Sequence, residues 1–417
     1  MSGGALTIGP AKIKALRRLL VDARADQITR VVAMIDSLPE RGEADDLLAP
    51  FRGRLAEIAP PRPLNFARLL FIPIDPLIVP GARWRRGTLG VPRTVLAPLA
   101  RHVERALAED ATAIKAMIAG RNVTDQAVIR SAGARLWPAA SRVLSSASPP
   151  PDWQDTTGLP DSDHATIAGA IAVVFAQAVA IQELVDACAS GSAPDDVETP
   201  VRAILIRAAE RGGQTLAVMI ALLMHRLPGF SRLPELAREI ADVQEKDGRM
   251  AAERATEYTL ERLANSPIIA LAANGAGGVL HAAETIAHAT TLLTGLAEQS
   301  TARPEQKIRI DELRRSIDRA CRDSFTLLLE RHLLVSLTSL TDPDDDTITG
   351  LETIARDLRA FEQASRQAGS GDFYDRVLRE AAKRIAAMSL PRIDRLRLVE
   401  IITSSETALT LLGTRPV

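Results

Sequence analysis

The chain has 417 residues and a formal net charge of −1, because 51 Lys and Arg residues oppose 52 Asp and Glu residues. Hydrophobic residues make up 46% of the chain and charged residues 25%, and this balance excludes a wholly disordered protein. Aromatic residues make up only 3%, which disfavours an all-β fold because strands are enriched in Tyr, Phe and Trp. The two cysteines, Cys188 and Cys321, cannot form a disulfide framework, and we expect a cytoplasmic protein.

Helical spacing of apolar residues begins near the N-terminus. Ile28, Val31, Ile35 and Leu38 recur every three or four residues and stop at a proline, as the buried stripe of a helix does. Residues 69–79 are apolar but contain two prolines, which lack the N–H group that a central strand requires. We predict that this segment is a buried, proline-stiffened crossover between helices, with a short edge strand or a docking surface as the alternatives.

Charge is sorted along the sequence. Residues 81–145 hold eleven Lys and Arg residues against four acids, whereas residues 146–200 hold nine acids and no Lys or Arg. This asymmetry predicts either that the two stretches attract one another or that each has its own partner. The alternative is that linkers are acidic and helices carry Arg on solvated faces. Arginine supplies 45 of the 51 cations, which suits phosphate recognition or reflects a GC-rich, bacterial-like codon usage.

The densest basic motif consists of Arg83, Trp84, Arg85 and Arg86. Trp and Arg are favoured at protein interfaces, so these four residues are the candidate binding site for a protein partner. The same residues suit nucleic acid, with the guanidinium groups on phosphates and the indole on a base, although no RRM, KH, zinc-finger or leucine-zipper pattern accompanies them. A purely structural alternative packs Trp84 behind residues 69–79 and leaves the arginines solvated.

The stretch 146–163 is rich in Pro, Ser and Asp and predicts a semi-rigid linker between two domains. The most apolar segment, residues 165–181, follows it. This segment is at the short limit for a membrane span and has no flanking Lys or Arg to anchor it. We therefore predict a helix buried in a globular core, and no membrane span.

The clearest helical stripe starts near Pro304 and runs towards Leu340. Its apolar residues are three or four positions apart, with one gap of seven that His332 fills: Ile310, Leu313, Ile317, Cys321, Phe325, Leu328 and Val335. This spacing predicts a long helix with Cys321 buried and chemically inert. A second stripe consists of Tyr374, Leu378, Ala381, Ile385 and Met388.

Thr349 and Glu352 form a capping-box pattern, which predicts a helix over residues 351–367. Three acids before it match the start of a calcium loop but lack the glycine and the final glutamate that the loop requires: Asp342, Asp344 and Asp346. We interpret them as a lead-in to the helix, because negative charge suits the N-terminal end of a helix dipole.

His281, Glu284 and His288 follow the pattern H-x2-E-x3-H, which aligns three potential metal ligands on one face of a helix. The two histidines would lie about 10 Å apart along a straight helix, so one ion cannot readily bind both. We keep the trio as a candidate metal site against an ordinary polar helix face, and expect no cofactor. The glycine loop 274–278 resembles a dinucleotide site but lacks its third glycine, so a helix–turn–helix corner is the better interpretation.

Together these patterns predict an all-α protein, a multi-helix array that is either solenoid-like or an irregular bundle. We expect a basic helical domain at 1–145, a linker at 146–163 and a helical array at 164–417. No G-x-S-x-G, Walker or zincin motif occurs, so we assign no catalytic residue and lean away from an enzyme. The predicted function is a non-catalytic scaffold that binds a protein partner, with homo-oligomerisation left open. The alternatives are nucleic-acid binding through residues 83–86 and a helical enzyme whose pocket leaves no sequence motif.

Overall fold

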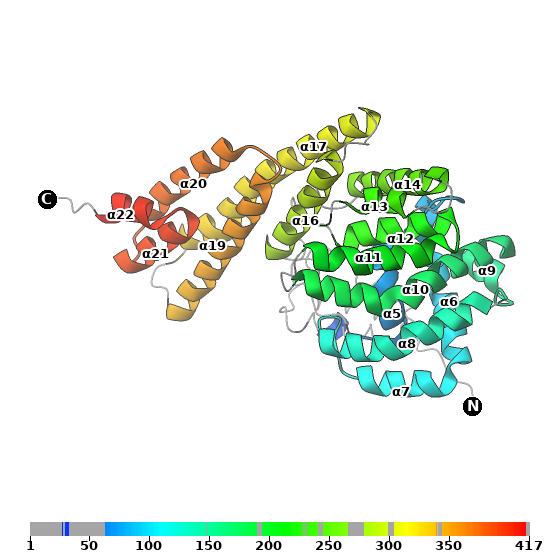
Figure 1. Ribbon diagram of the computed structural model, residues 1–417. Coiled ribbons are helices and arrows are strands. Elements are labelled where there is room, and N and C mark those ends of the chain that lie inside the picture. Colours follow the sequence, from blue (N-terminus) through cyan, green and yellow to red (C-terminus); the bar gives the residue numbers. More distant parts are fainter. Residues whose placement is uncertain are drawn as a thin grey trace. The chain divides into compact units, whose positions relative to one another are not determined.

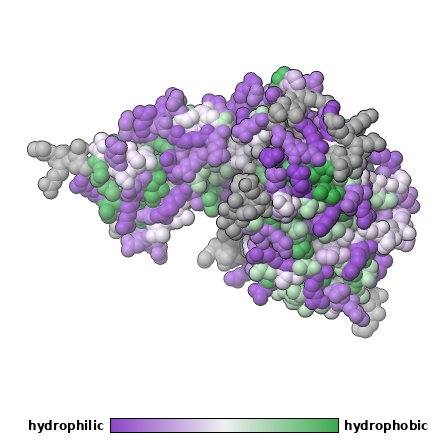
Figure 2. Space-filling model, viewed as in Figure 1, coloured by the Kyte–Doolittle hydropathy of each residue, from purple (hydrophilic) through white to green (hydrophobic). Residues whose placement is uncertain are grey.

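The fold was analysed in a computed structural model. The structure describes residues 27, 30–32, 63–146, 148–189, 194–227, 230, 232–240, 245–265, 279–298, 304–338, 340 and 344–413. Within these ranges almost all regular structure is helical, and the strands are limited to one two-residue pair (Figure 1). The predicted all-α multi-helix array is therefore confirmed. Figure 2 shows hydrophilic side chains over much of the visible face of each part of the chain.

Two compact units share the described residues. The first takes in those of Pro61–Arg262 and Gly295–Arg303, and we call it the 61–262 unit. The second takes in those of Leu263–Thr294 and Pro304–Val417, with the few that are described before Pro60, and we call it the C-terminal unit. This division differs from the expected boundary at 146–163, which lies inside the 61–262 unit.

The 61–262 unit begins with the segment that the sequence predicts as a proline-stiffened crossover. Helix α5 (Phe66–Phe71) is capped by Asn65, whose Oδ1 accepts a hydrogen bond from the Arg68 N–H at 2.8 Å. The 3-10 helix η2 (Ile72–Leu77) contains both prolines, and strand β1 (Ile78–Val79) ends the segment. Most of these residues are buried, so the crossover is confirmed in its burial, although it is helical over most of its length.

The helices that follow stack on one another in chain order. They are η3 (Gly81–Arg83), η4 (Arg93–Val95), α6 (Leu96–Ala106), α7 (Ala108–Ile118), α8 (Gln126–Ser146), α9 (Trp153–Thr157), α10 (Asp161–Ala189), α11 (Pro194–Ala209), α12 (Gly213–Arg226), α13 (Leu233–Glu239) and α14 (Glu245–Ala264). Helix α7 contacts α8, α8 contacts α10, and α10 contacts α11 (Figure 1), whereas the short helix α9 contacts α6 and η4.

The contact between α8 and α10 forms the centre of the core. Trp137 of α8 is 1% exposed, and its indole Nε1 donates a hydrogen bond to the Leu69 carbonyl at 3.0 Å. Gly133 lies one turn before it, where a Cβ atom would overlap the Trp137 ring. Ser141 of α8 donates a hydrogen bond to the Ala172 carbonyl of α10 at 2.7 Å. The Trp137 indole thus joins α8 to α5, and the missing side chain of Gly133 leaves room for the indole ring within α8.

The predicted linker 146–163 is folded into this core over most of its length. Trp153 of α9 is completely buried, and its Nε1 donates a hydrogen bond to the Pro160 carbonyl at 3.3 Å. Gly158 ends α9 in the left-handed conformation, with φ of 70°, which favours glycine. Proline and serine content predicted a linker here, but the single tryptophan anchors the segment to the core.

Helix α10 is the one helix in the described part of the chain that is long and apolar enough to cross a membrane. The candidate segment is Asp161–Cys188; its most apolar 18-residue window has a mean hydropathy of 1.9, and 56% of that window is buried inside the protein. Buried core helices meet the same criteria of length and composition, so this is weak support for a span. The burial agrees with the prediction of a core helix.

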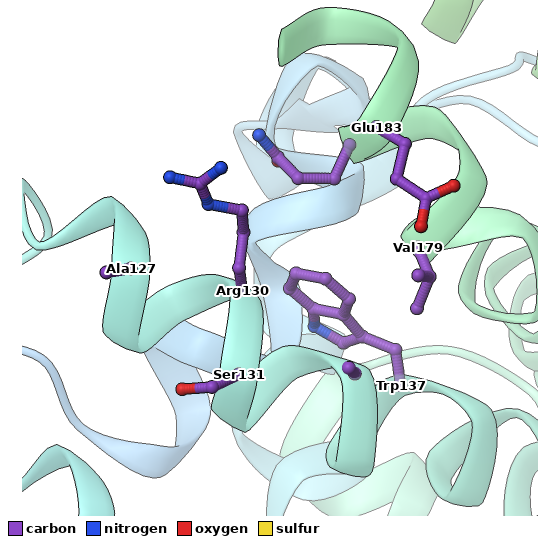
Figure 3. A pocket seen from close by; sticks show the side chains of 8 residues that line it. Ala127, Arg130, Ser131, Trp137, Val179 and Glu183 are labelled. Atoms are coloured by element: carbon purple, nitrogen blue, oxygen red, sulfur yellow. The ribbon is translucent and has the colours of Figure 1, made fainter.

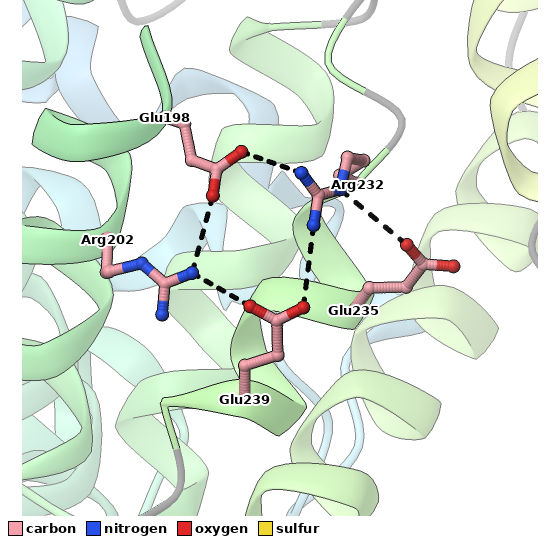
Figure 4. A network of polar contacts seen from close by, with 5 residues as sticks. All are labelled: Glu198, Arg202, Arg232, Glu235 and Glu239. Atoms are coloured by element: carbon pink, nitrogen blue, oxygen red, sulfur yellow. Dashed lines mark hydrogen bonds and ion pairs between the residues drawn. The ribbon is translucent and has the colours of Figure 1, made fainter. Parts of the chain in front are cut away.

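A network of ion pairs joins α11 to α13 (Figure 4). Arg202 lies 2.8 Å from Glu239 and 3.3 Å from Glu198, measured from its Nη2 to the carboxylate oxygens. Arg232 contacts Glu198 at 2.8 Å and also reaches Glu239 and Glu235. The hydrogen bonds that Arg202 donates to Glu239 and Glu198 raise its pKa. These ion pairs link the short helix α13 to α11 at the protein surface.

The C-terminal unit is built around α17. Its elements are α16 (Val279–Glu298, with the residues up to Thr294 in this unit), α17 (Pro304–Leu328), the π-helical turn η5 (Leu329–Leu334), α18 (Val335–Thr338), α19 (Asp345–Arg366), α20 (Gly371–Ala386), α21 (Arg392–Ile402) and α22 (Ser405–Gly413). Helices α17, α19 and α20 contact one another, and α21 packs on α19 and α20 (Figure 1).

The predicted stripe on α17 is confirmed up to Leu328 and wrong beyond it. Ile310, Cys321 and Phe325 are each at most 1% exposed, whereas Val335 is 54% exposed. The π-helical turn η5 widens the helix by about one residue per turn and so rotates the following side chains. The core positions are therefore Leu333 and Leu334 within the turn and Leu337 after it.

An aromatic cluster fills the core between α17, α19 and α20. The ring centroid of Phe325 lies 6.2 Å from that of Phe361 and 5.3 Å from that of Tyr374. Cys321 lies on the same face of α17, and burial raises the pKa of its thiol to about 11. The prediction that Cys321 is buried is confirmed, and its raised pKa keeps the thiol protonated and unreactive near neutral pH.

Helix α19 begins earlier than the capping box predicts. Asp344 is the N-cap residue, and its side chain accepts a hydrogen bond from the Thr347 N–H at 2.9 Å. Hydrogen bonds from Thr347 lower the pKa of Asp344, because they stabilise its carboxylate. Thr349 therefore lies inside the helix, and its hydroxyl donates to the Asp345 carbonyl. The interpretation of the acids as a helix lead-in holds for Asp344 and Asp346, whereas Asp342 lies outside the described residues.

Candidate functional site

The Arg83–Arg86 motif lies on a loop, residues 80–90, whose two ends are fastened together; we call it the arginine loop. Strand β1 before it pairs in parallel with β2 (Val91–Pro92) after it. Gly90 makes this close approach possible, because a Cβ atom there would lie 3.0 Å from the Val79 side chain. Gly87 adopts φ of 85° at the turn that follows the arginines. The loop therefore leaves and returns to the core at one place.

Helix α14 holds the loop from one side. Arg254, Tyr258 and Arg262 are four residues apart and share one face of the helix. They donate hydrogen bonds to three main-chain carbonyl oxygens in and before the loop: those of Gly87 at 2.7 Å, Leu77 at 3.3 Å and Ile78 at 3.1 Å. Burial raises the pKa of Tyr258, so this phenol stays a hydrogen-bond donor. Arg254 thus holds the loop itself, and Tyr258 and Arg262 hold the segment that leads into it.

Trp84 is half-buried rather than fully packed behind the apolar segment. Its indole Nε1 donates a hydrogen bond to the Gly90 carbonyl at 3.0 Å, across the base of the loop. Arg85 is exposed, and its Nη1 donates hydrogen bonds to the carbonyls of Ala82 and Trp84. Within the described part of the chain, neither Arg83 nor Arg85 has an acidic partner. The loop therefore presents two exposed, uncompensated positive charges.

Arg86 differs from the other two arginines because it points to the start of α10. Its Nη2 lies 2.7 Å from Asp163 Oδ1 and donates a hydrogen bond to the Ser162 hydroxyl at 3.1 Å. The Asp163 side chain is 10% exposed, whereas the Arg86 side chain is 65% exposed. The nearly buried carboxylate therefore anchors the exposed guanidinium and, through it, the tip of the loop.

A pocket of about 320 Å³ lies between the arginine loop, α10 and α12. Trp84, Leu89, Ile167 and Val218 give it an apolar wall, and the pair of Arg86 and Asp163 gives it a charged edge. Its volume is at the lower limit of ordinary small-ligand sites and would accept one large apolar side chain. The pocket and the two free arginines lie on the same loop.

The basic and acidic stretches contact each other in the fold. Besides the pair of Arg86 and Asp163, Arg130 Nη1 lies 3.0 Å from Asp186 Oδ2, and Arg101 Nη2 lies 3.8 Å from Asp152 Oδ2. Each pair joins a cation from residues 81–145 to an acid from residues 146–200. The first of the two explanations for the charge asymmetry, mutual attraction, is therefore what the structure bears out for these pairs.

A second pocket, of about 490 Å³, lies between α8 and α10 and was not predicted (Figure 3). Trp137 and Val179 form its apolar floor, with Arg130 and Glu183 at the rim. The only sequence signal for it is the spacing of small residues on the outer face of α8, Ala127, Ser131 and Ala134. Such spacing is common on helices that pack in a core, so it does not single out a pocket.

The candidate metal trio lies on α16, where Glu284 is exposed and His288 is half-buried. Burial lowers the pKa of His288. The side chain of His281 lies outside the described part of the structure, and the same holds for the glycine loop 274–278. Among the described residues, no group of three His, Cys, Asp or Glu side chains is placed to hold a metal ion. The trio therefore stays a sequence prediction.

No protein-family model matches the sequence, and comparison with curated proteins and with solved structures gives no significant match. The site is therefore interpreted from its own geometry.

Proposed function

We propose that this chain is a non-catalytic helical binding protein whose arginine loop receives an acidic segment of a protein partner. The observation that carries the proposal is the contrast among three neighbouring arginines. Arg86 is held by Asp163, whereas Arg83 and Arg85 are exposed and have no acidic partner in the described residues. An acidic segment would supply the missing countercharges, and the pocket beside Trp84 would take one of its apolar side chains.

The loop is preorganised for such binding. A hydrogen bond from Arg254 holds its backbone, bonds from Tyr258 and Arg262 hold the segment that leads into it, and Trp84 closes its base. A rigid loop loses little conformational entropy when a partner binds, which favours affinity from a small interface. We regard cytoplasmic binding of a protein partner as the role that fits a stacked helical array of this kind.

Nucleic-acid binding through residues 83–86 is the second candidate. The indole N–H of Trp84 is already bonded and its ring is half-buried, which limits stacking on a base. Two free arginines would also give few phosphate contacts, whereas affinity for nucleic acid grows with their number. These features favour a protein segment over a polynucleotide.

A helical enzyme is the third candidate. Among the described residues that line the pocket of the arginine loop there is no His or Cys, and its one carboxylate, Asp163, is paired with Arg86. General acid–base or nucleophilic catalysis needs a group that is free to exchange a proton or to attack. The lining therefore suits binding better than catalysis.

The proposal is tested with synthetic peptides that carry four acidic residues around a central Leu or Phe, titrated against the full chain. Trp84 is the only partly exposed tryptophan, because Trp137 and Trp153 are buried, so a change in indole emission reports on the loop. We expect the double charge reversal R83E/R85E to weaken binding at least tenfold. The matched reversal R121E/R142E changes two exposed arginines of the same basic stretch and should alter binding less than twofold.

Two results would count against the proposal. Equal loss of binding in both double variants would mean that only the net charge matters. Preference for single-stranded DNA or RNA over acidic peptides at matched charge and salt, lost in R83E/R85E, would favour the nucleic-acid reading instead.

A further inference from the structure

We infer that the pocket between α6 and α7 binds a small phosphorylated molecule through its phosphate group. The pocket has a volume of about 420 Å³, within the range of small-ligand sites. Three cationic side chains line it, those of Arg101, Arg105 and Lys115, against the single carboxylate of Glu104. This site is separate from the arginine loop and does not depend on the function proposed for it.

The geometry of the two helices brings these cations together. Arg101 and Arg105 are four residues apart and so share a face of α6. The chain bends at Leu107, whose N–H donates to the Val103 carbonyl at 3.0 Å, and α7 starts at once. Lys115 of α7 then reaches back to Glu104 of α6, with which it forms an ion pair. Two helices joined by one residue thus form the walls of one pocket.

The charges inside the pocket do not cancel. Glu104 is occupied by Lys115, and Arg105 has no acidic partner in the described part of the chain. The nearest acid to Arg101 is Asp152, at 3.8 Å, and both side chains are about half exposed. A pair at that distance and exposure contributes little. The lining therefore has two positive charges in excess, which matches a phosphate monoester dianion.

The chemistry of the donors favours a phosphate over other anions. Each arginine offers a planar fork that can bond two phosphate oxygens, and an ammonium adds a third, mobile donor. The Thr112 hydroxyl lies on the same wall of α7 and donates to the Ala108 carbonyl at 3.0 Å, so its lone pairs face away from that bond. Two alanines, Ala108 and Ala111, line the pocket between the cations and leave room for the ligand.

Other acids near the pocket have partners of their own or lie off its lining. Asp110 in the first turn of α7 lies 3.4 Å from Arg135 of α8. Glu109 is exposed and does not line the pocket. The excess of two positive charges is therefore a property of the pocket lining itself.

The test is calorimetric titration of the full chain with inorganic phosphate and with glycerol phosphate at constant ionic strength. We expect millimolar or tighter binding of both, and at least tenfold weaker binding in R101Q/R105Q. The E104Q variant should bind phosphate more tightly, about three- to tenfold, because it removes the competing carboxylate and frees Lys115. A gain of binding cannot come from misfolding, so this variant keeps the test informative if the double variant is unstable.

Control experiments distinguish a specific phosphate site in this pocket from nonspecific attraction of anions to arginines. They also distinguish a free phosphate group from the phosphate of a lipid headgroup. The matched variant R121Q/R142Q should bind phosphate as the wild type does, and R83E/R85E should as well, which separates this site from the arginine loop. The inference is overturned if phosphate binds no better than chloride, if all arginine variants lose binding equally, or if binding occurs only to vesicles that contain phosphatidic acid.

Discussion

Arg86 and Asp163 are 2.7 Å apart at their Nη2 and Oδ1 atoms, although one belongs to the basic stretch 81–145 and the other to the acidic stretch 146–200. The Asp163 carboxylate is almost buried at the start of α10, whereas most of the arginine is exposed. A residue that is fixed in the core thus fixes the tip of a surface loop. The pair links the charge pattern of the sequence to the geometry of the proposed binding site.

Replacing Asp163 with Asn should therefore loosen the arginine loop. The neutral amide cannot balance the guanidinium of Arg86, and we expect the free energy of unfolding to fall by about 1 kcal/mol, as for a partly exposed ion pair. Trypsin should cleave after Arg83, Arg85 or Arg86 several times faster than in the wild type, because the loop backbone becomes more mobile. Limited proteolysis followed by mass spectrometry measures this change.

The control for this variant is Asp155→Asn, which removes an exposed acid of the same stretch that has no partner among the described residues. It should leave loop cleavage unchanged. If both variants accelerate cleavage equally, the pair with Arg86 does not hold the loop.

The sequence showed that the two stretches carry opposite charge, but it left open whether they contact each other. Counting charges showed that residues 81–145 and 146–200 are opposite in sign, and mutual attraction was one of the explanations offered. Which cation meets which acid depends on the packing of α8 against α10 and of the arginine loop against both α10 and α12. The pair of Arg86 and Asp163 joins residues more than 70 positions apart, and no local pattern encodes it.

The helices were predictable where local spacing and packing agree. The stripe from Tyr374 to Ile385 is buried as expected, because α20 is a regular helix with one apolar face. The prediction that Val335 lies on the buried stripe is wrong, because the π-helical turn before it changes the number of residues per turn. No composition signal marks such a turn. Asp344 replaces the predicted cap because an aspartate caps a helix as well as a threonine does.

The folded segment at 146–163 could not be predicted from composition. Its prolines and serines are typical of a linker, yet Trp153 is completely buried and His164 packs edge-on against it, with ring centroids 4.8 Å apart. One large aromatic side chain can bury enough apolar area to hold a short segment in place. The outcome depends on whether the core offers a cavity of the right shape, which the local sequence does not reveal.

Two helical glycines should respond in opposite ways to the same substitution. At Gly133 an alanine methyl would overlap the buried Trp137 ring, so we expect Gly133→Ala to destabilise the 61–262 unit by about 1 to 2 kcal/mol, after a small gain in helix propensity. At Gly169 of α10 a methyl meets open space, so Gly169→Ala should stabilise by about 0.5 to 1 kcal/mol. Each serves as the control for the other.

Urea unfolding followed by tryptophan emission measures the change in stability that each substitution causes in the 61–262 unit. All three tryptophans, Trp84, Trp137 and Trp153, belong to the 61–262 unit, so their emission reports on that unit alone. Destabilisation by both alanines, or by neither, would contradict the described difference in space around Gly133 and Gly169.

In the C-terminal unit, Glu362 should matter far more than an exposed glutamate. Its side chain is completely buried and lies between Arg359, at 2.6 Å, and Arg366, which also pairs with Asp375. The hydrogen bonds that Arg366 donates to Asp375 and Glu362 raise its pKa. Glu362→Gln removes the shared countercharge in a buried place, and we expect a loss of about 2 kcal/mol in the free energy of unfolding.

The comparison for Glu362 is Glu380→Gln on α20. Glu380 and Lys383 are 3.8 Å apart, and their side chains are 68% and 65% exposed, so this substitution should change stability by less than about 0.5 kcal/mol. Thermal unfolding followed by circular dichroism, which sees both units, resolves the difference. Equal effects of the two variants would show that burial of Glu362 does not strengthen its ion pairs.

His164 should make the 61–262 unit sensitive to acid. The side chain is completely buried against Trp153, and neither ring nitrogen has a hydrogen-bond partner in the described structure. Burial lowers the pKa of His164 below its ordinary value of 6.5, His102 lowers it further, and Asp161 opposes them weakly. Because the folded state binds the proton less well than the unfolded state, stability is complete above about pH 6.5 and falls as the pH drops through that value.

Replacing His164 with Leu should remove this acid sensitivity. At neutral pH the variant should be as stable as the wild type or more so, because two unpaired ring nitrogens are removed from the core. Between about pH 7 and pH 5 its free energy of unfolding, measured by tryptophan emission in urea, should fall less than that of the wild type. His332→Gln changes a half-exposed histidine of the C-terminal unit and should leave the pH profile of tryptophan emission unaltered. A wild-type slope that persists in His164→Leu would assign the acid sensitivity to another group.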